Sequence, residues 1–147
     1  MLWIVDENAF WQLIEDCKPG TPDPDAEQLV AALTSRLVEG PLATVKQFAE
    51  QLSWALYRLD RREYGHNVSG DAFLYTRAAV VAAGRGTYDR VLRDPAAFEP
   101  FATGNVWAES LLYVPDRAYE HLTGEEWGRR TRYSYESYSN TKGWARS

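Results

Sequence analysis

The residues best suited to chemistry form a polar stretch in the middle of the chain. Guanidinium groups bind phosphates and carboxylates through paired N–H donors, and a histidine titrates near neutral pH, so it can transfer a proton. We therefore consider a binding site for a small anion or a nucleotide. Such a site could also be the active site of an enzyme. Its candidate residues are Arg58, Asp60, His66, Asp71, Arg77 and Arg85.

The same stretch has a structural interpretation, which the sequence favours. Arg58, Arg61 and Arg62 would complement the dipole at the carboxyl end of a helix. Ser69 and Asp71 would cap the next helix. No glycine-rich loop with the spacing that cradles phosphate accompanies these arginines.

Arg77 poses a separate question because its neighbours are apolar. It lies four residues after Phe73 and three before Val80, on a helix face that we expect to be buried. A buried guanidinium needs a carboxylate partner, unless its stem carries the charge to the surface. Either arrangement is favoured over the binding of an external carboxylate.

A second group of candidate residues lies in the last part of the chain. Residues 125–147 combine five large aromatic side chains with a net charge of +2. The alternation of Tyr133 and Tyr135 suits an extended segment. Five large aromatic side chains are unsuited to a free tail in water, and we therefore expect this segment to pack on the helices or on a partner. Tyr, Trp and Arg dominate interface hot spots. The candidate partner-binding residues are Trp127, Arg130, Arg132, Tyr133, Tyr135, Tyr138 and Trp144.

Other kinds of site find little support. Cys17 falls on an apolar helix face, which suits a core residue better than a nucleophile. The two histidines are 55 residues apart, without the spacing of paired metal ligands. The C-terminal segment mixes cations with aromatics as single-strand binders do, but its small charge argues against nucleic acid. We expect no metal and no cofactor, and we favour a non-catalytic protein while leaving enzymatic activity open.

Composition and length set the frame for these sites. The chain has 147 residues, a formal net charge of −5, 45% hydrophobic and 25% charged residues, which is typical of one soluble domain. The longest apolar run, residues 78–83, is too short to span a bilayer. The start lacks a basic leader, so we predict a cytoplasmic protein without a membrane partner.

Apolar spacing and capping residues predict an all-α fold of five or six helices. Residues 61–70 and 96–104 are expected to be connections, and Pro115 is expected to kink the last helix. The expected helices follow Asp6, Asp23 and Pro41, then Ser69 or Asp71, then Gly86 and Asn105, with ends near Cys17, Gly40, Asp60, Gly84, Arg93 and Gly124.

Several short segments together resemble a family. They are DENAFWQLI from Asp6, SGDAF from Ser69, GRG from Gly84 and ESLLYV from Glu109. In this order they are similar to a bacterial family known as domain of unknown function 4240 (DUF4240), over about residues 6–125. The resemblance implies a small, mainly helical bacterial domain; the family has no assigned activity, so the resemblance supplies no mechanism. Residues 60–68 depart from the family's pattern, which is richer there in aromatic and aliphatic residues.

These observations lead to one prediction with an alternative. We expect a single helical domain over residues 1–124, with an aromatic and basic tail over residues 125–147 packed on it. The favoured function is a non-catalytic protein-interaction or regulatory module, with an unidentified protein partner. The alternative is the anion or nucleotide site around residues 58–85. Residues 1–5 would pack under the tail or take part in self-association.

Overall fold

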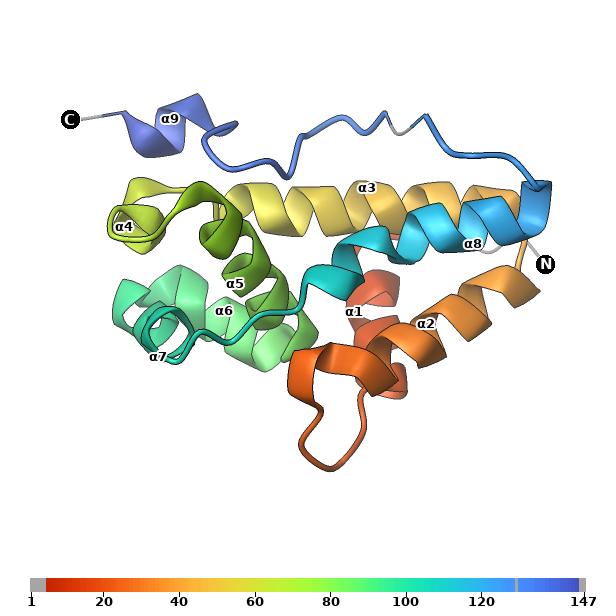
Figure 1. Cartoon of the computed structure of the whole chain (residues 1–147), viewed down its shortest axis with the longest axis horizontal. Coiled ribbons are helices and arrows are strands. Elements are labelled where there is room, and N and C mark those ends of the chain that lie inside the picture. The colour runs from red at the N-terminus through yellow and green to blue at the C-terminus, as the bar shows by residue number, and fades with distance from the viewer. Residues whose placement is uncertain (1–4, 129, 146–147) are drawn as a thin grey trace.

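The computed structural model describes residues 5–128 and 130–145 (Figure 1). This part of the chain is 70% helical and contains no strand, so the predicted all-α class is confirmed. The helices of nine or more residues number six. They are α1 Glu7–Cys17, α2 Glu27–Glu39, α3 Leu42–Arg58, α5 Gly70–Ala82, α6 Arg85–Arg93 and α8 Val114–Thr123.

Short helical turns connect these six. Among the described residues they raise the α-helix count to nine, above the five or six predicted. The short α-helices are α4 Arg62–Gly65, α7 Glu99–Thr103 and α9 Thr141–Trp144, and the 3-10 turns are η1 Pro24–Ala26, η2 Pro95–Phe98 and η3 Glu109–Tyr113.

Local signals set several helix ends as predicted. Asp6 caps α1 by accepting a hydrogen bond from the backbone N–H of Ala9 at 2.8 Å. Asp23 accepts from the backbone N–H groups of Gln28 and Leu29, but α2 begins at Glu27, after the η1 turn, and not directly after Asp23 as predicted. Gly124 ends α8 in the left-handed conformation, with φ 73°.

The predicted connection over residues 96–104 is wrong, because η2 and α7 occupy it. Asp94 accepts a hydrogen bond from the backbone N–H of Ala96 and starts η2. Phe98 is buried between Tyr64 and Phe73, with ring centroids 5.4 and 5.9 Å away. The contacts of Phe98 with these two rings therefore stabilise helical turns in a segment whose prolines predict a loop.

The predicted kink at Pro115 is also wrong. The chain makes the η3 turn first, and α8 begins at Val114, so Pro115 lies in its first turn. A proline costs no helical hydrogen bond there. Asn105 does not cap a helix but has φ 49°, in an irregular stretch before η3.

The connection over residues 61–70 contains α4, which the apolar pattern did not predict. Tyr64 is buried and donates its hydroxyl to the carbonyl of Val91 at 2.9 Å. Gly65 packs so closely on α5 that an added Cβ would lie 2.7 Å from the ring of Phe73. α4 is thus held by contacts with distant segments rather than by its own four residues.

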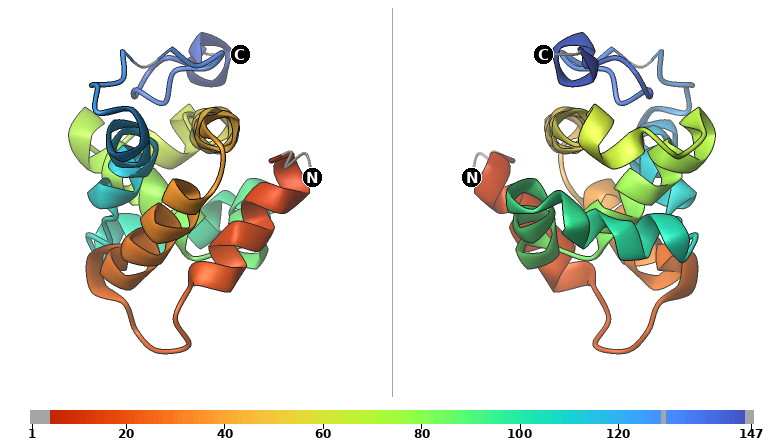
Figure 2. Two further views of the ribbon diagram at one scale, coloured as in Figure 1. Left: turned by 90° about the vertical axis from the view of Figure 1, so that its right-hand side faces the viewer. Right: turned by 90° about the vertical axis from the view of Figure 1, so that its left-hand side faces the viewer.

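Helix α3 is the element around which the others are arranged. It packs against α1, α2, α5 and α8, and it buries Val45, Phe48 and Leu52. After α8 the chain runs back along the outside of α3 and ends with α9 near α4 (Figures 1 and 2). The last segment therefore covers a face of α3 and α5 that the other helices leave open.

Candidate functional site

The segment over residues 130–145, which we call the C-terminal strap, lies on α3 and α5. From residue 131 to residue 139 its half-buried side chains alternate with exposed ones. This period of two is typical of an extended backbone. The strap has no strand partner among the described residues, so its main-chain groups bond to side chains of the helices instead.

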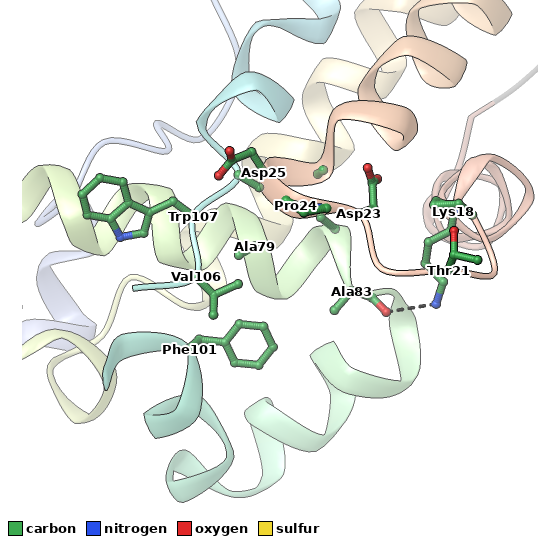
Figure 3. Close-up of a pocket in the computed structure, with 14 residues that line it drawn as sticks. Lys18, Thr21, Asp23, Pro24, Asp25, Ala79, Ala83, Phe101, Val106 and Trp107 are labelled. Carbon is green, nitrogen blue, oxygen red and sulfur yellow. Dashed lines mark hydrogen bonds between the residues drawn. The ribbon is translucent and has the colours of Figure 1, made fainter. Parts of the chain in front are cut away.

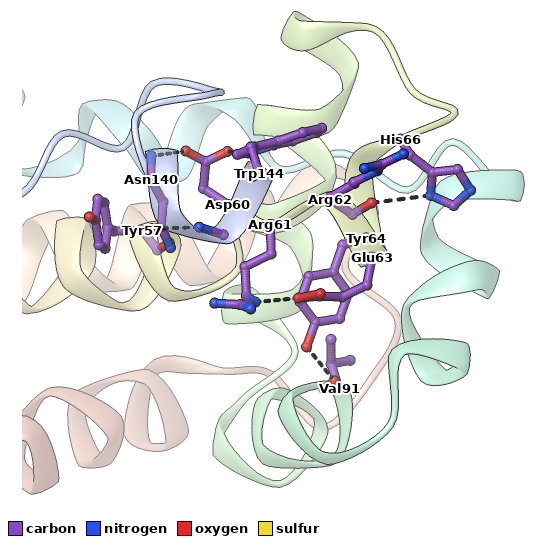
Figure 4. A network of polar contacts seen from close by, with 11 residues as sticks. Tyr57, Asp60, Arg61, Arg62, Glu63, Tyr64, His66, Val91, Asn140 and Trp144 are labelled. Atoms are coloured by element: carbon purple, nitrogen blue, oxygen red, sulfur yellow. Dashed lines mark hydrogen bonds and ion pairs between the residues drawn. The ribbon is translucent and has the colours of Figure 1, made fainter. Parts of the chain in front are cut away.

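Asp60 is the first of these side chains, and it is fully buried at the end of α3. Its Oδ1 accepts hydrogen bonds from the backbone N–H of Tyr138 at 2.9 Å and the indole N–H of Trp144 at 2.7 Å. Its Oδ2 accepts from the backbone N–H of Asn140 at 2.8 Å (Figure 4). One carboxylate therefore receives three donors from the strap, which compensates for its burial.

Arg77 of α5 is the second, and it too is fully buried. Its guanidinium donates to the carbonyl of Leu56 at 2.9 Å, to the carbonyl of Tyr135 at 3.0 Å and to the hydroxyl of Ser137 at 3.0 Å. It also lies 4.5 Å from the ring centroid of Phe73. Arg77 thus joins α3, α5 and the strap.

The partners of Arg77 differ from the expected carboxylate. Among the described residues its hydrogen bonds go to two carbonyls and a hydroxyl. Burial lowers the pKa of Arg77 to about 10, and the nearby negative charges of Asp60 and Glu136 oppose that shift. The guanidinium still carries its charge at neutral pH, so the interior holds a cation whose ligands come largely from the main chain.

An aromatic socket receives the middle of the strap. The ring of Tyr133 lies 4.6 Å from that of Trp54 and 4.7 Å from that of Tyr57, both on α3. One turn earlier on α3, the Glu50 carboxylate accepts from the backbone N–H of Arg132 at 3.0 and 3.2 Å. Because Glu50, Trp54 and Tyr57 lie on one face of α3, the strap runs along this helix.

The end of the strap forms α9, which packs against the helices. Trp144 packs edge-on against Phe73 and Tyr138, with centroids 5.8 and 4.8 Å away. Gly143 lies so close to the end of α3 that a Cβ would come within 2.9 Å of the Arg61 side chain and 3.0 Å of the Asp60 carbonyl. Only a glycine fits this approach without a shift.

The structure does not bring the six predicted anion-binding residues into one pocket. Asp60 and Arg77 both hold the strap, as described above. Arg58 lies over the rings of Trp54 and Tyr88, at 5.6 and 6.0 Å. Arg85 pairs with Glu7 of α1 at 3.4 Å. His66 and Asp71 are exposed, at the end of α4 and in the first turn of α5.

The predicted partner-binding residues divide into two groups. Those that contact the helices are Trp127, which stacks on Tyr119 at 5.5 Å, together with Tyr133, Tyr135 and Trp144. Those with exposed side chains are Arg130, Arg132 and Tyr138. Residues 1–4 lie outside the described residues. Val5 is buried, and its backbone N–H donates to Gln47.

A separate apolar hollow of about 350 Å³ lies between the start of η1, the end of α5 and the stretch after α7 (Figure 3). Trp107 and Val106 are partly exposed beside it. Asp25 and Ala26, on its wall, have φ of 58° and 57°, which is strained for residues other than glycine. At its rim, Lys18 donates to the carbonyl of Ala83 at 3.1 Å. Apolar side chains and alanines form much of the lining.

The groups considered for catalysis and metal binding have structural surroundings. Cys17 is buried on α1, and burial raises the pKa of its thiol, which disfavours the reactive thiolate. The described residues contain no cluster of three or more side chains able to hold a metal ion. In the same part of the chain, no helix has the length and hydropathy to cross a membrane.

The strap is held by Glu50, Trp54 and Tyr57 of α3, by Asp60 after α3 and by Arg77 of α5. We call this strap-covered face the groove. The chain is thus a helical protein with an extended polypeptide segment on its surface. The model of a protein family of unknown function, DUF4240, matches residues 5–121, and the chain belongs to this family. The match includes Glu50, Asp60 and Arg77, and it ends before the strap. Searches of curated proteins and of solved structures found no match.

Proposed function

We propose that the chain is a non-catalytic interaction module and that the groove holding the strap is its binding surface for an extended polypeptide segment. One observation carries this proposal. Asp60 and Arg77, both fully buried, make hydrogen bonds to main-chain atoms of the strap. Buried charges are costly without such partners, so the helical body is built around a segment at this place.

The chemistry of the groove defines the kind of segment that it accepts. Glu50 and Asp60 accept from backbone N–H groups, and Arg77 donates to a backbone carbonyl. Main-chain bonds give affinity without sequence selectivity. Specificity then comes from the Trp54–Tyr57 socket, which receives Tyr133, and from Asp60 and Phe73, which contact the indole of the strap's Trp144. The preferred segment is therefore extended and carries spaced aromatic residues.

The strap makes the groove regulated, because it occupies the groove in cis. A partner segment binds only when the strap is released, so the apparent Kd for the partner is the intrinsic Kd divided by the fraction of chains with a released strap. A cytoplasmic location in a bacterium goes with this proposal. The free thiol of Cys17 supports a cytoplasmic location, because thiols stay reduced in that compartment.

The test uses a fluorescent synthetic peptide of residues 130–145 added to the full chain. Weakening the strap with Tyr133→Ala frees the groove, so this variant should bind the peptide more tightly than the unaltered chain, as measured by fluorescence anisotropy. The matched control is Arg130→Ala, whose exposed side chain leaves the strap in place. Equal binding by both variants, or equal binding of a scrambled peptide, would show that the groove is not a polypeptide-binding surface.

A further inference from the structure

A basic cleft lies where the end of the strap meets α4. Its volume is about 730 Å³, and it lies between the body and α9. Figure 4 shows the α4 side of this cleft, beside the buried Asp60. The lining residues are Arg61, Arg62, Glu63, His66, Lys142, Gly143 and Ala145.

The charge of the cleft is strongly positive for a protein whose net charge is −5. Two arginines and a lysine face one carboxylate. Glu63 already pairs with Arg61. Within residues 5–128 and 130–145, no ion pair engages Arg62 or Lys142. Among the described residues, the cleft therefore holds two cations from different segments that have no ion-pair partner.

His66 adds a fixed polar group to the rim. Its Nδ1 lies 3.1 Å from the carbonyl of Arg62, and its Nε2 lies 2.9 Å from the side-chain amide of Asn67. In the neutral ring these contacts are a donated and an accepted hydrogen bond. The imidazole is thus oriented by α4 itself.

The cleft exists only when the strap is docked, because α9 provides one of its walls. Gly143 lies against the side chain of Arg61 and the carbonyl of Asp60. Asn140, which receives the N–H of Gly143, is itself bonded to Asp60 and to the carbonyl of Tyr57. These contacts hold α9 in place, so Lys142 of the strap and Arg62 of the body line the same cleft.

We propose that this cleft binds a small phosphate-bearing anion, which bridges Arg62 and Lys142 and latches the strap onto the body. A guanidinium and an ammonium suit a doubly charged phosphate, since each donates charge-assisted hydrogen bonds. A ligand that binds only the docked arrangement stabilises it by mass action. The anion site does not rest on the proposed function, because it needs only the docked strap and no partner segment.

The test titrates the full chain with inorganic pyrophosphate and follows binding by calorimetry. Sodium chloride at matched ionic strength is the reference for screening. We expect saturable binding that Arg62→Ala and Lys142→Ala each weaken about tenfold or more. Arg90→Ala is the matched control, because this exposed arginine of α6 lies outside the cleft. Equal loss in all three variants, or no binding beyond the chloride reference, would overturn the site.

A second measurement tests the latch. Limited proteolysis of the strap should slow when pyrophosphate is present, in the unaltered chain and in Arg90→Ala but not in Lys142→Ala. Saturable binding without any slowing would overturn the latch and leave the anion site standing. Neither result depends on the labelled-peptide experiment, so a failure here is distinguishable from a failure of the interaction proposal.

Discussion

Helix α3 is covered on two faces by different physical means. One face presents Val45, Phe48 and Leu52 to the other helices, in an apolar core. The other presents Glu50, Trp54 and Tyr57 to the strap. Apolar burial is non-directional and contributes in proportion to area. Hydrogen bonds between charged side chains and a main chain are directional, so they fix one segment in one register. The first face stabilises the helical body, and the second holds the strap in one register.

The largest effect is expected on the apolar face. Phe48→Ala removes a fully buried ring that packs on Phe10 at 5.1 Å, so we expect a loss of about 4 kcal/mol in the free energy of unfolding. Chemical denaturation followed by circular dichroism measures this loss. The strap should be released no later than the helices melt, because side chains of the helices form its binding face. A strap that stayed docked after the helices had melted would contradict the division between the two faces.

The next effect is expected at the buried carboxylate under the strap. Asp60→Ala leaves three strap donors without their acceptor, so we expect strap docking to weaken by about 3 kcal/mol. The helical signal in circular dichroism should remain while proteolysis between residues 125 and 145 accelerates. Asp71→Ala, at an exposed acid of α5, is the control and should leave the strap protected. Global unfolding of the Asp60 variant would show that the two faces are one cooperative unit.

A smaller effect is expected in the aromatic socket. Tyr133→Ala removes a ring that contacts Trp54 and Tyr57, and it should weaken strap docking by about 1–2 kcal/mol. Tryptophan fluorescence reports the change, because Trp54 loses a neighbouring ring. Tyr133→Phe keeps the ring and should preserve docking. An alanine variant with the proteolysis rate of the unaltered strap would show that main-chain bonds alone hold this segment.

The smallest effect is expected from a hydroxyl on the body side. Tyr88 is buried and donates its hydroxyl to the carbonyl of Ala55 at 2.6 Å, so Tyr88→Phe should cost about 1 kcal/mol near neutral pH.

The same substitution has a pH dependence with a definite sign. Burial raises the pKa of Tyr88 above its ordinary value of 10.0, so the folded chain keeps this proton when the unfolded chain loses it. The stabilisation is complete below pH 10 and is lost as the pH rises above it. Denaturation midpoints between pH 9 and 11 should therefore fall less in Tyr88→Phe. An equal fall in both proteins would show that Tyr88 does not contribute to alkaline unfolding.

Helices and helix ends whose signals are local could be predicted from the sequence alone. The apolar stripe of α3, the cap at Asp6 and the terminator at Gly124 all act within a few residues, so spacing and residue type suffice to predict them. The same reasoning singled out Arg77, because a charge on an apolar helix face is conspicuous in a sequence, whereas Asp60 was one member of the expected anion-binding cluster.

The roles of Asp60 and Arg77 depend on long-range tertiary contacts. The bonds between Asp60 and the strap join residues 78 to 84 positions apart, and helical periodicity holds no information about such separations. For the same reason α4 and α7 were missed, since Tyr64, Gly65 and Phe98 are held by distant partners. A buried charge is costly unless hydrogen bonds compensate for its lost hydration. Only folding brings the strap's donors to Asp60 and its carbonyl to Arg77, whose Nε has no hydrogen-bond partner among the described residues.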